Sequence, residues 1–299
     1  MAALQFGVNV ATSADDGADP VGDARRAEEL GFDFVSSNDH PCGSNPSFET
    51  WTMLTWIAAS TSRIGIATRV LGVPFRPPAL LAKMAATLDT LSGGRLILGL
   101  GGGSGDDEFR AYGLGLPSPR EKTDGLEDAV TIIRGLWSEP RFTHQGRRYS
   151  TEEAELEPKP SRRIPIWLGT YAPRALRVTG RLADGWIPSL GYADPDEVPA
   201  MRERILEAAR KAGRDPAEIT CVFNVEVRID GAADDEPSVI SGSADEVAER
   251  LAGFLGLGFS ALNFMPPLGP EYGEQVERLA SEVIPAVRSS VESQASTRS

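Results

Sequence analysis

Three short segments of this sequence carry residue types that could do chemistry, and each of them follows an apolar run. The first is Ser37-Asn38-Asp39-His40, which holds one of only two histidines in the chain. Because imidazole exchanges protons near neutral pH, His40 is a candidate general acid or base, with Asp39 or a backbone group fixing its tautomer. The alternative is a structural histidine that caps a loop.

The second segment, Gly99-Leu100-Gly101-Gly102-Gly103-Ser104-Gly105, is rich in glycine. It lacks the third glycine of the G-x-G-x-x-G dinucleotide pattern. Three acidic residues, Asp106 to Glu108, follow at once and would repel a pyrophosphate at a helix start. We interpret the segment as backbone without side chains, which a flat ring can approach closely. A flexible surface loop is the alternative.

The third segment is Gly169-Thr170-Tyr171-Ala172-Pro173, followed by Arg174. Proline favours the first turn of a helix, where backbone N–H groups are free to bind an anion. With the hydroxyl of Thr170 and the guanidinium of Arg174 nearby, the segment predicts a phosphate site. An ordinary capped turn between a strand and a helix would explain the same residues.

Other kinds of site find little support. Two histidines and two cysteines, all far apart except for His40 and Cys42, offer no usual metal-ligand spacing, and Cys42 is badly placed to be a nucleophile activated by His40. The chain has no G-x-S-x-G elbow and no P-loop. Acidic residues are abundant, so the carboxylate pair of a glycosidase stays open.

The composition restricts the class of protein. Of the 299 residues, 30 are basic and 43 acidic, which gives a formal charge of −13 and argues against nucleic acid as a partner. No apolar run is long enough to cross a bilayer, and the first residues do not resemble a signal peptide. We therefore expect a cytoplasmic protein that acts on a small molecule and has no membrane partner.

The elements that must position these segments alternate along the whole chain. Eight short apolar runs predict strands, and eight amphipathic segments predict helices between them. This count in about 250 residues is typical of a (β/α)8 TIM barrel, in which reactive groups lie at the carboxyl ends of the strands. The expected strands are 4–10, 32–36, 64–68, 96–100, 164–168, 185–187, 221–227 and 261–264.

We expect one domain, residues 1–289, and a disordered tail, residues 290–299. Three connections exceed the usual length of a barrel loop. They follow strand 2 (residues 38–48), helix 4 (138–163, with a hairpin around a Gln-Gly turn) and strand 7 (230–241).

At these residues the chain resembles the luciferase-like flavin and deazaflavin oxidoreductases, a superfamily of TIM barrels. The resemblance covers residues 4–287 and rests on the order of several motifs. They are Ser37-Asn38-Asp39-His40, Ile66-Ala67-Thr68-Arg69-Val70, residues 88–96 (LDTLSGGRL), Gly99-Leu100-Gly101-Gly102-Gly103 and Asp184-Gly185-Trp186. The run Ala212 to Ile219 (AGRDPAEI) is similar to the branch that uses coenzyme F420.

The resemblance implies further properties. His40 would lie at the reactive edge of the cofactor ring, a non-proline cis peptide would lie around Arg69-Val70, and the protein would be a homodimer. The cofactor would contact Asp39, Arg69, Val70, Gly101, Gly102, Gly103, Ser104, Gly169, Thr170, Tyr171 and Arg174. One residue departs from the pattern: sugar-phosphate dehydrogenases of this branch carry a catalytic glutamate where this chain has Ser104, and a hydroxyl cannot replace that acid.

The resulting hypothesis is an F420-dependent oxidoreductase that transfers a hydride to or from a small organic substrate, with His40 as the catalytic residue and no metal. The nearest alternative is an FMN-dependent monooxygenase on the same barrel. A barrel that only binds or carries the cofactor is a third possibility, and a metal-free glycosidase that binds no chromophore is a fourth.

Overall fold

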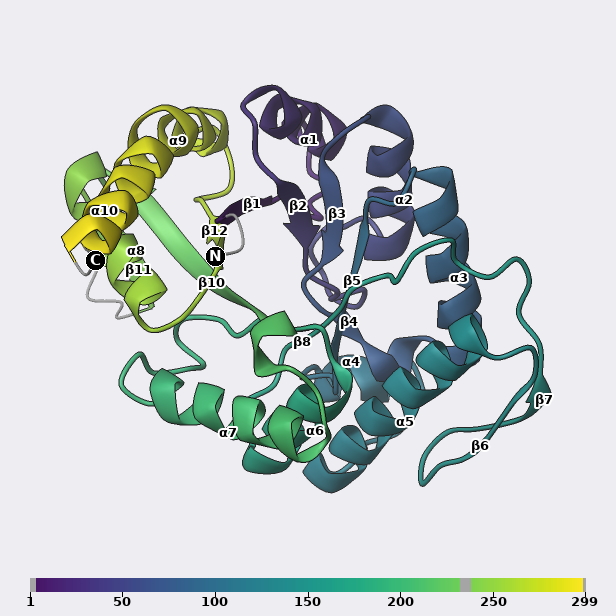
Figure 1. Ribbon diagram of the computed structural model, residues 1–299. Helices are drawn as coiled ribbons and strands as arrows, with labels where there is room; N and C mark the ends of the chain where they lie inside the picture. Colours follow the sequence, from purple (N-terminus) through teal and green to yellow (C-terminus); the bar gives the residue numbers. More distant parts are fainter. Residues whose placement is uncertain (1–3, 232–237, 298–299) are drawn as a thin grey trace.

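The computed structural model describes residues 4–231 and 238–297, and its centre is a closed ring of eight parallel strands. Each strand pairs with its neighbours in chain order, and the last pairs with the first. Figure 1 shows the helices arranged around this ring. The predicted (β/α)8 barrel is confirmed. Its strands are β1 (Gln5–Asn9), β2 (Phe34–Ser37), β3 (Gly65–Thr68), β5 (Leu96–Gly101), β8 (Ile166–Leu168), β9 (Gly185–Trp186), β10 (Thr220–Ile229) and β12 (Ala261–Met265).

Strands form where apolar residues are buried on both faces, as parallel strands covered by helices require. All of Ile166–Leu168 is buried, and so are the first four residues of Ala261–Met265. The surrounding helices begin at clear sequence signals. A capping box joins Ser118 to Glu121 in one helix, and another joins Ser243 to Glu246. The helices are α1 (Pro20–Glu29), α2 (Thr50–Ser60), α3 (Pro78–Leu91), α5 (Pro119–Ser138), α6 (Pro173–Leu182), α7 (Val198–Lys211) and α8 (Ala244–Gly256).

Additional elements occupy the long connections. The predicted hairpin after α5 is present as β6 (Phe142–Gln145) and β7 (Ser150–Ala154), which pair antiparallel. After β10, β11 (Val239–Gly242) pairs with it in parallel, while residues 232–237 of this connection lie outside the described residues. The connection between β3 and α3 contains β4 (Leu71–Gly72), which pairs with β5, and the short 3-10 helix Val73–Phe75 follows it.

One short helix was not predicted and lies next to the glycine run. This is α4 (Asp106–Ala111), whose first turn consists of the acids that follow Gly105. Acidic side chains favour a helix amino terminus, so the residues that argue against a pyrophosphate instead begin a helix.

A helix runs through residues 290–297, where we expected a disordered tail. The chain runs from α9 (Tyr272–Arg278) through a π-helical segment (Leu279–Val283) into α10 (Ile284–Thr297). Buried Val287 anchors the beginning of α10, and the guanidinium of Arg288 lies 4.9 Å from the centre of the Phe6 ring. No glycine or proline follows Pro285 up to residue 297, so nothing in the sequence stops the helix.

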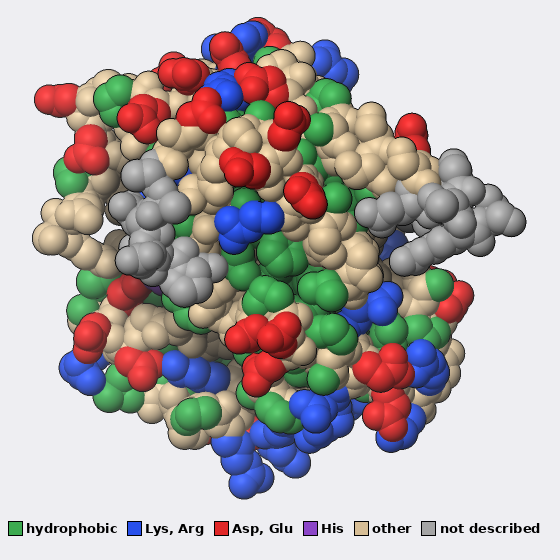
Figure 2. All heavy atoms as spheres, turned by 90° about the vertical axis from the view of Figure 1, so that its left-hand side faces the viewer, with side chains coloured by type: hydrophobic (Ala, Val, Ile, Leu, Met, Phe, Trp, Pro, Cys, Tyr) green, Lys and Arg blue, Asp and Glu red, His purple; other side chains and the backbone are tan. Residues whose placement is uncertain are grey.

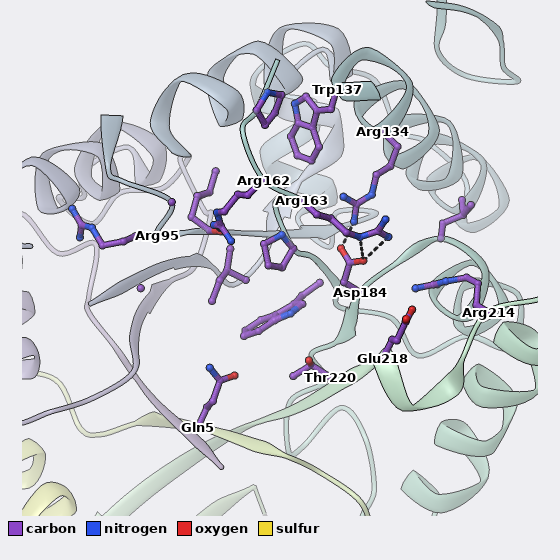
Figure 3. A pocket seen from close by; sticks show the side chains of 18 of the residues that line it. Gln5, Arg95, Arg134, Trp137, Arg162, Arg163, Asp184, Arg214, Glu218 and Thr220 are labelled. Atoms are coloured by element: carbon purple, nitrogen blue, oxygen red, sulfur yellow. Dashed lines mark hydrogen bonds and ion pairs between the residues drawn. The ribbon is translucent and has the colours of Figure 1, made fainter. Parts of the chain in front are cut away.

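A cavity of about 1370 Å³ lies at the amino-terminal end of the barrel. Figure 3 shows Arg134 and Arg163 both directed at Asp184, with which they form ion pairs. Arg95 and Arg214 donate to backbone carbonyl groups where helices end. These guanidinium groups are already used to tie strand starts to helix ends, so this end of the barrel supports the fold.

Candidate active site

A cavity of about 380 Å³ lies at the opposite end, where the strands finish. It collects residues from the ends of β2, β3, β5, β8 and β9, which is where a TIM barrel places its reactive groups. Ten of the twelve residues predicted for the site line this cavity. They are Asp39, His40, Arg69, Val70, Gly101, Gly102, Gly103, Ser104, Gly169 and Tyr171.

Val70 forms the floor of the cavity between two glycines. The peptide bond between Arg69 and Val70 is cis, as the resemblance implies. A Cβ atom built on Gly101 would lie 2.7 Å from Cγ2 of Val70, and one on Gly169 would lie 3.2 Å from the same atom. Because any side chain at Gly101 would collide with Val70, the glycine run gives the cavity an open, flat wall at this point.

Arg69 brings a partly buried positive charge to the same part of the cavity. Its guanidinium donates hydrogen bonds to Oδ1 of Asn9, at 3.3 Å from Nε and 3.1 Å from Nη2. Burial lowers the pKa of the Arg69 guanidinium to about 10, although Tyr171 and Glu226 act in the opposite direction. At neutral pH Arg69 therefore remains a cation, and it can stabilise negative charge that develops on a molecule in the cavity.

His40 has a carboxylate partner that the sequence did not indicate. Its Nδ1 lies 2.7 Å from Oε1 of Glu108, the third residue of α4. The side chain of Glu108 is only 16% exposed, and its other oxygen, Oε2, is buried without a hydrogen-bond partner among the described residues. A carboxylate at Nδ1 orients the ring and leaves Nε2 to exchange a proton.

Asp39 does not hold the tautomer of His40. Its carboxylate is fully buried, and it accepts hydrogen bonds from both terminal nitrogens of Arg76, at 2.8 and 3.0 Å, and from the backbone N–H of Gly72 at 3.0 Å. Arg76 also pairs with Glu49 at the start of α2. Asp39 thus fixes the connection between β4 and α3 at the edge of the cavity, and its oxygens are already bound.

The residues of the predicted phosphate site do not all face the cavity. Gly169 and Tyr171 line the cavity, whereas Thr170 between them, just after the end of β8, is buried and does not line it. Its hydroxyl lies 2.7 Å from that of Thr179 in α6. The guanidinium of Arg174 forms an ion pair with Asp124 of α5 and faces the outside of the barrel. The prediction for these two side chains is therefore wrong.

Ser189 and Asn224, which the sequence did not single out, complete the cavity wall beside Tyr171. Tyr171 Oη accepts a hydrogen bond from the N–H of Ser189 at 3.1 Å, and burial raises the pKa of this phenol, so it stays protonated. Buried Asn224 donates to Oγ of Ser189 at 3.1 Å and accepts from Asn263 at 2.8 Å. An asparagine inside the apolar run 221–227 was the available signal, because a buried amide needs partners that only a polar barrel interior supplies.

A second cavity, of about 680 Å³, adjoins the first and shares Asn38 and Arg69 with it. It opens over the ends of β1, β10 and β12, next to Asn9, Glu226 and Met265. The mouth of the barrel therefore has two connected compartments with the Arg69 side chain between them. Such an arrangement can hold a flat cofactor and a small second molecule side by side.

The described part of the chain contains neither a cluster of metal-binding side chains nor a helix suited to a membrane. Within residues 4–231 and 238–297, no three His, Cys, Asp or Glu side chains gather in a way that would hold a metal ion. Of the helices that the structure describes, none has both the length and the apolar character to cross a membrane.

Comparison with known proteins agrees with this geometry. The curated F420-dependent glucose-6-phosphate dehydrogenase of Microbacterium testaceum is 30% identical, over 88% of this chain and 91% of that protein. The enzyme of the same name from Kineococcus radiotolerans is also 30% identical, over 89% and 91%.

Two solved structures show the same fold. An F420-dependent secondary alcohol dehydrogenase in complex with an F420-acetone adduct gives a TM-score of 0.84 at 21% identity, over 95% of this chain and 99% of that one. The coenzyme F420 dependent tetrahydromethanopterin reductase from Methanopyrus kandleri gives 0.81 at 21% identity, over the same shares. The family model of the luciferase-like monooxygenases matches residues 3–236, and with the two 30% identical relatives it shows that this chain belongs to that family.

Proposed function

We propose that this protein is an oxidoreductase that uses coenzyme F420 to transfer a hydride to or from a small organic substrate. The observation that carries the proposal is the flat wall at Gly101, set against Val70 and beside the partly buried cation of Arg69. The F420-dependent relatives, 30% identical over most of both chains, support the choice of cofactor.

The residues at the mouth fit a deazaflavin. The glycine run, residues 101–103, would face the ring edge, and Val70 would support one of its faces. Arg69 would lie near the electron-rich pyrimidine part of the ring, where a cation is favourable. The phosphate of the tail would lie by the backbone of Gly169 and Tyr171, since the side chains of Thr170 and Arg174 face elsewhere. When bound, the cofactor supplies the hydride donor or acceptor.

His40 and Glu108 can transfer the proton that accompanies the hydride. A hydride added to a carbonyl leaves negative charge on oxygen, and Nε2 of His40 can deliver a proton to that atom. Glu108 holds the ring through Nδ1 and stabilises the imidazolium whenever it forms. In the oxidation direction the same pair removes the proton from an alcohol.

The contact between Glu108 and His40 also bears on the choice of substrate, because this chain has Ser104 where related enzymes carry a glutamate. The carboxylate that the sugar-phosphate dehydrogenases carry directly after the glycine run is absent, but a carboxylate from α4 reaches His40. We propose that the substrate is a small alcohol or carbonyl compound held in the adjoining cavity, near Arg69 and Asn9. Sugar-phosphate oxidation is disfavoured because Glu108 approaches from a different position and is already bound to His40.

Titration of the apoprotein tests the cofactor. Quenching of intrinsic or deazaflavin fluorescence should give stoichiometric binding of F420, tighter than binding of FMN. A clear preference for FMN would favour the alternative, an FMN-dependent monooxygenase. Binding of F420 without turnover of any donor or acceptor would instead indicate a carrier protein.

We further propose that the protein is a single-domain, cytoplasmic homodimer. The support for a dimer is exposed apolar surface on neighbouring helices, namely Trp56 of α2 (69% exposed) and Leu80 and Leu91 of α3 (55% and 79%). Sedimentation equilibrium should give twice the mass of the chain, and Trp56→Asp should shift it toward the monomer.

A further inference from the structure

A groove on the outer surface of the barrel, of about 470 Å³, has five basic side chains among its eight lining residues. It lies between α6, which contributes Arg174, Arg177 and Arg181, and α7, which contributes Arg204 and Lys211. Glu207 is its one acidic lining residue. In Figure 2, Lys and Arg side chains gather at the lower edge of the face shown, the level at which Figure 1 shows α6 and α7.

Three of these five cations have carboxylate partners. Arg174 pairs with Asp124, Arg181 with Glu127 at 2.7 Å, and Lys211 with Glu207 at 2.6 Å. Arg177 and Arg204 are exposed, and neither has a hydrogen bond or ion pair with any described residue. Arg204 has only the nearby charge of Glu207, which Lys211 already binds, and Arg177 has no carboxylate partner among the described residues. A chain of net charge −13 therefore keeps an excess of positive charge in this one groove.

The groove begins close to the proposed cofactor site. Tyr171 lines the cavity at the barrel mouth, and Arg174, three residues later, lines the groove. Three residues of chain span at most about 11 Å. The near end of the groove therefore lies within about 11 Å, measured along the backbone, of a residue that lines the cavity.

The net charge of the protein makes this local arrangement useful. F420 carries a phosphodiester followed by a tail of glutamate residues, so every added glutamate increases the repulsion from a protein of charge −13. Guanidinium groups bind carboxylates with matched geometry. Resting on the proposed function, we infer that the groove between α6 and α7 binds the oligoglutamate tail of F420, with Arg177 and Arg204 as its main ligands.

The test compares F420 carrying no glutamate, two glutamates and five glutamates, with binding measured by fluorescence titration. In the wild-type protein, affinity should rise with tail length by about 1.5-fold to fivefold for each ion pair formed, and this gain should shrink as salt is added. Arg177→Glu and Arg204→Glu should each remove most of the gain while leaving the affinity for the form without glutamate within about twofold.

Arg250→Glu is the matched control, because Arg250 is an exposed residue on α8 and the charge change is the same. It should keep the dependence on tail length. If Arg250→Glu lost the dependence on tail length to the same extent, only the overall charge of the protein would matter. If the wild-type protein bound all three forms of F420 equally well, the groove would not bind the tail. Either result overturns the inference but leaves the proposed function standing. Failure of the form without glutamate to bind at all would instead overturn the proposed function.

Discussion

His40 and Glu108 meet at 2.7 Å although they are separated by 68 positions in the sequence. Residue 40 follows β2, and residue 108 belongs to α4, so the pair forms only when the strand and the short helix meet at the rim of the barrel. The histidine side chain is 50% exposed and the glutamate side chain 16%. The carboxylate is thus held by the protein, while the imidazole faces the mouth of the cavity.

Replacing His40 should separate catalysis from binding. His40→Ala should leave F420 affinity within about tenfold and reduce turnover by roughly 10²–10⁴, the usual effect of losing a general acid or base. His40→Gln keeps a hydrogen-bonding group that cannot titrate, so it should be as slow as His40→Ala. Near-full activity of His40→Gln would mean that His40 only orients the ring or the substrate.

Glu108 should act as a positioning residue for His40. Glu108→Gln keeps the size of the side chain and removes its charge, so kcat should fall by about 10- to 100-fold, the value of a charge-assisted hydrogen bond of about 1.5–3 kcal/mol. KM and cofactor affinity should stay within about threefold. Asp107→Asn is the control, because Asp107 is the neighbouring acid, is 95% exposed and pairs with Arg110. If both variants lose the same activity, the loss reflects the charge of α4 and not the contact with His40.

Thr170 should matter for stability and not for the cofactor. Its hydroxyl bonds to Thr179 inside the protein, and Thr179 also donates to the carbonyl of Ala175 at 3.2 Å. Thr170→Val should therefore lower the free energy of unfolding in urea by about 0.5–1.5 kcal/mol. F420 affinity should not change. If Thr170→Val bound F420 ten times more weakly at unchanged stability, the Thr170 hydroxyl would be shown to bind the phosphate of the cofactor.

Asp23 should make the protein less stable as the pH rises. Burial, with a smaller contribution from Asp19, raises the pKa of the Asp23 carboxyl from 3.8 to about 6. The folded state binds this proton more tightly than the unfolded state, so the penalty is absent below pH 3.8, grows between 3.8 and 6, and is complete above 6. After allowance for its partial exposure, Asp23→Asn should stabilise the protein by about 1–2 kcal/mol at pH 7.

Urea unfolding of both proteins between pH 4 and pH 8 checks this. The difference in unfolding free energy should shrink toward zero as the pH falls to 4. A difference that stays constant over the whole range would show that the ionisation of Asp23 has no part in it.

The sequence allowed the barrel and half of the site to be predicted, because both follow from local patterns. Apolar runs mark the strands, and the rule that reactive groups follow strand ends placed His40, Gly101 and Gly169 at one mouth. Thr170 was misplaced because it follows the end of β8, and the turn into α6 directs its hydroxyl to Thr179, which lies nine positions further on.

Long-range pairs could not be predicted in the same manner. Glu108 was interpreted only as a charge that repels phosphate, since nothing in the sequence shows that α4 packs beside His40. Arg76 lies 37 positions from Asp39, and only the folded chain reveals that it occupies that carboxylate. The same holds for the contact of Arg288 with the ring of Phe6, which lies at the other end of the sequence.

The most direct measurement of the central claim follows the absorbance of F420 and the consumption of oxygen together, with purified protein and a panel of small alcohols and carbonyl compounds. The account predicts that one of these substrates changes the redox state of F420 in the absence of oxygen, that no oxygen is consumed when air is admitted, and that His40→Ala loses the reaction while still binding F420. Oxygen uptake that requires reduced FMN, with no reaction of F420 with any substrate, would contradict it.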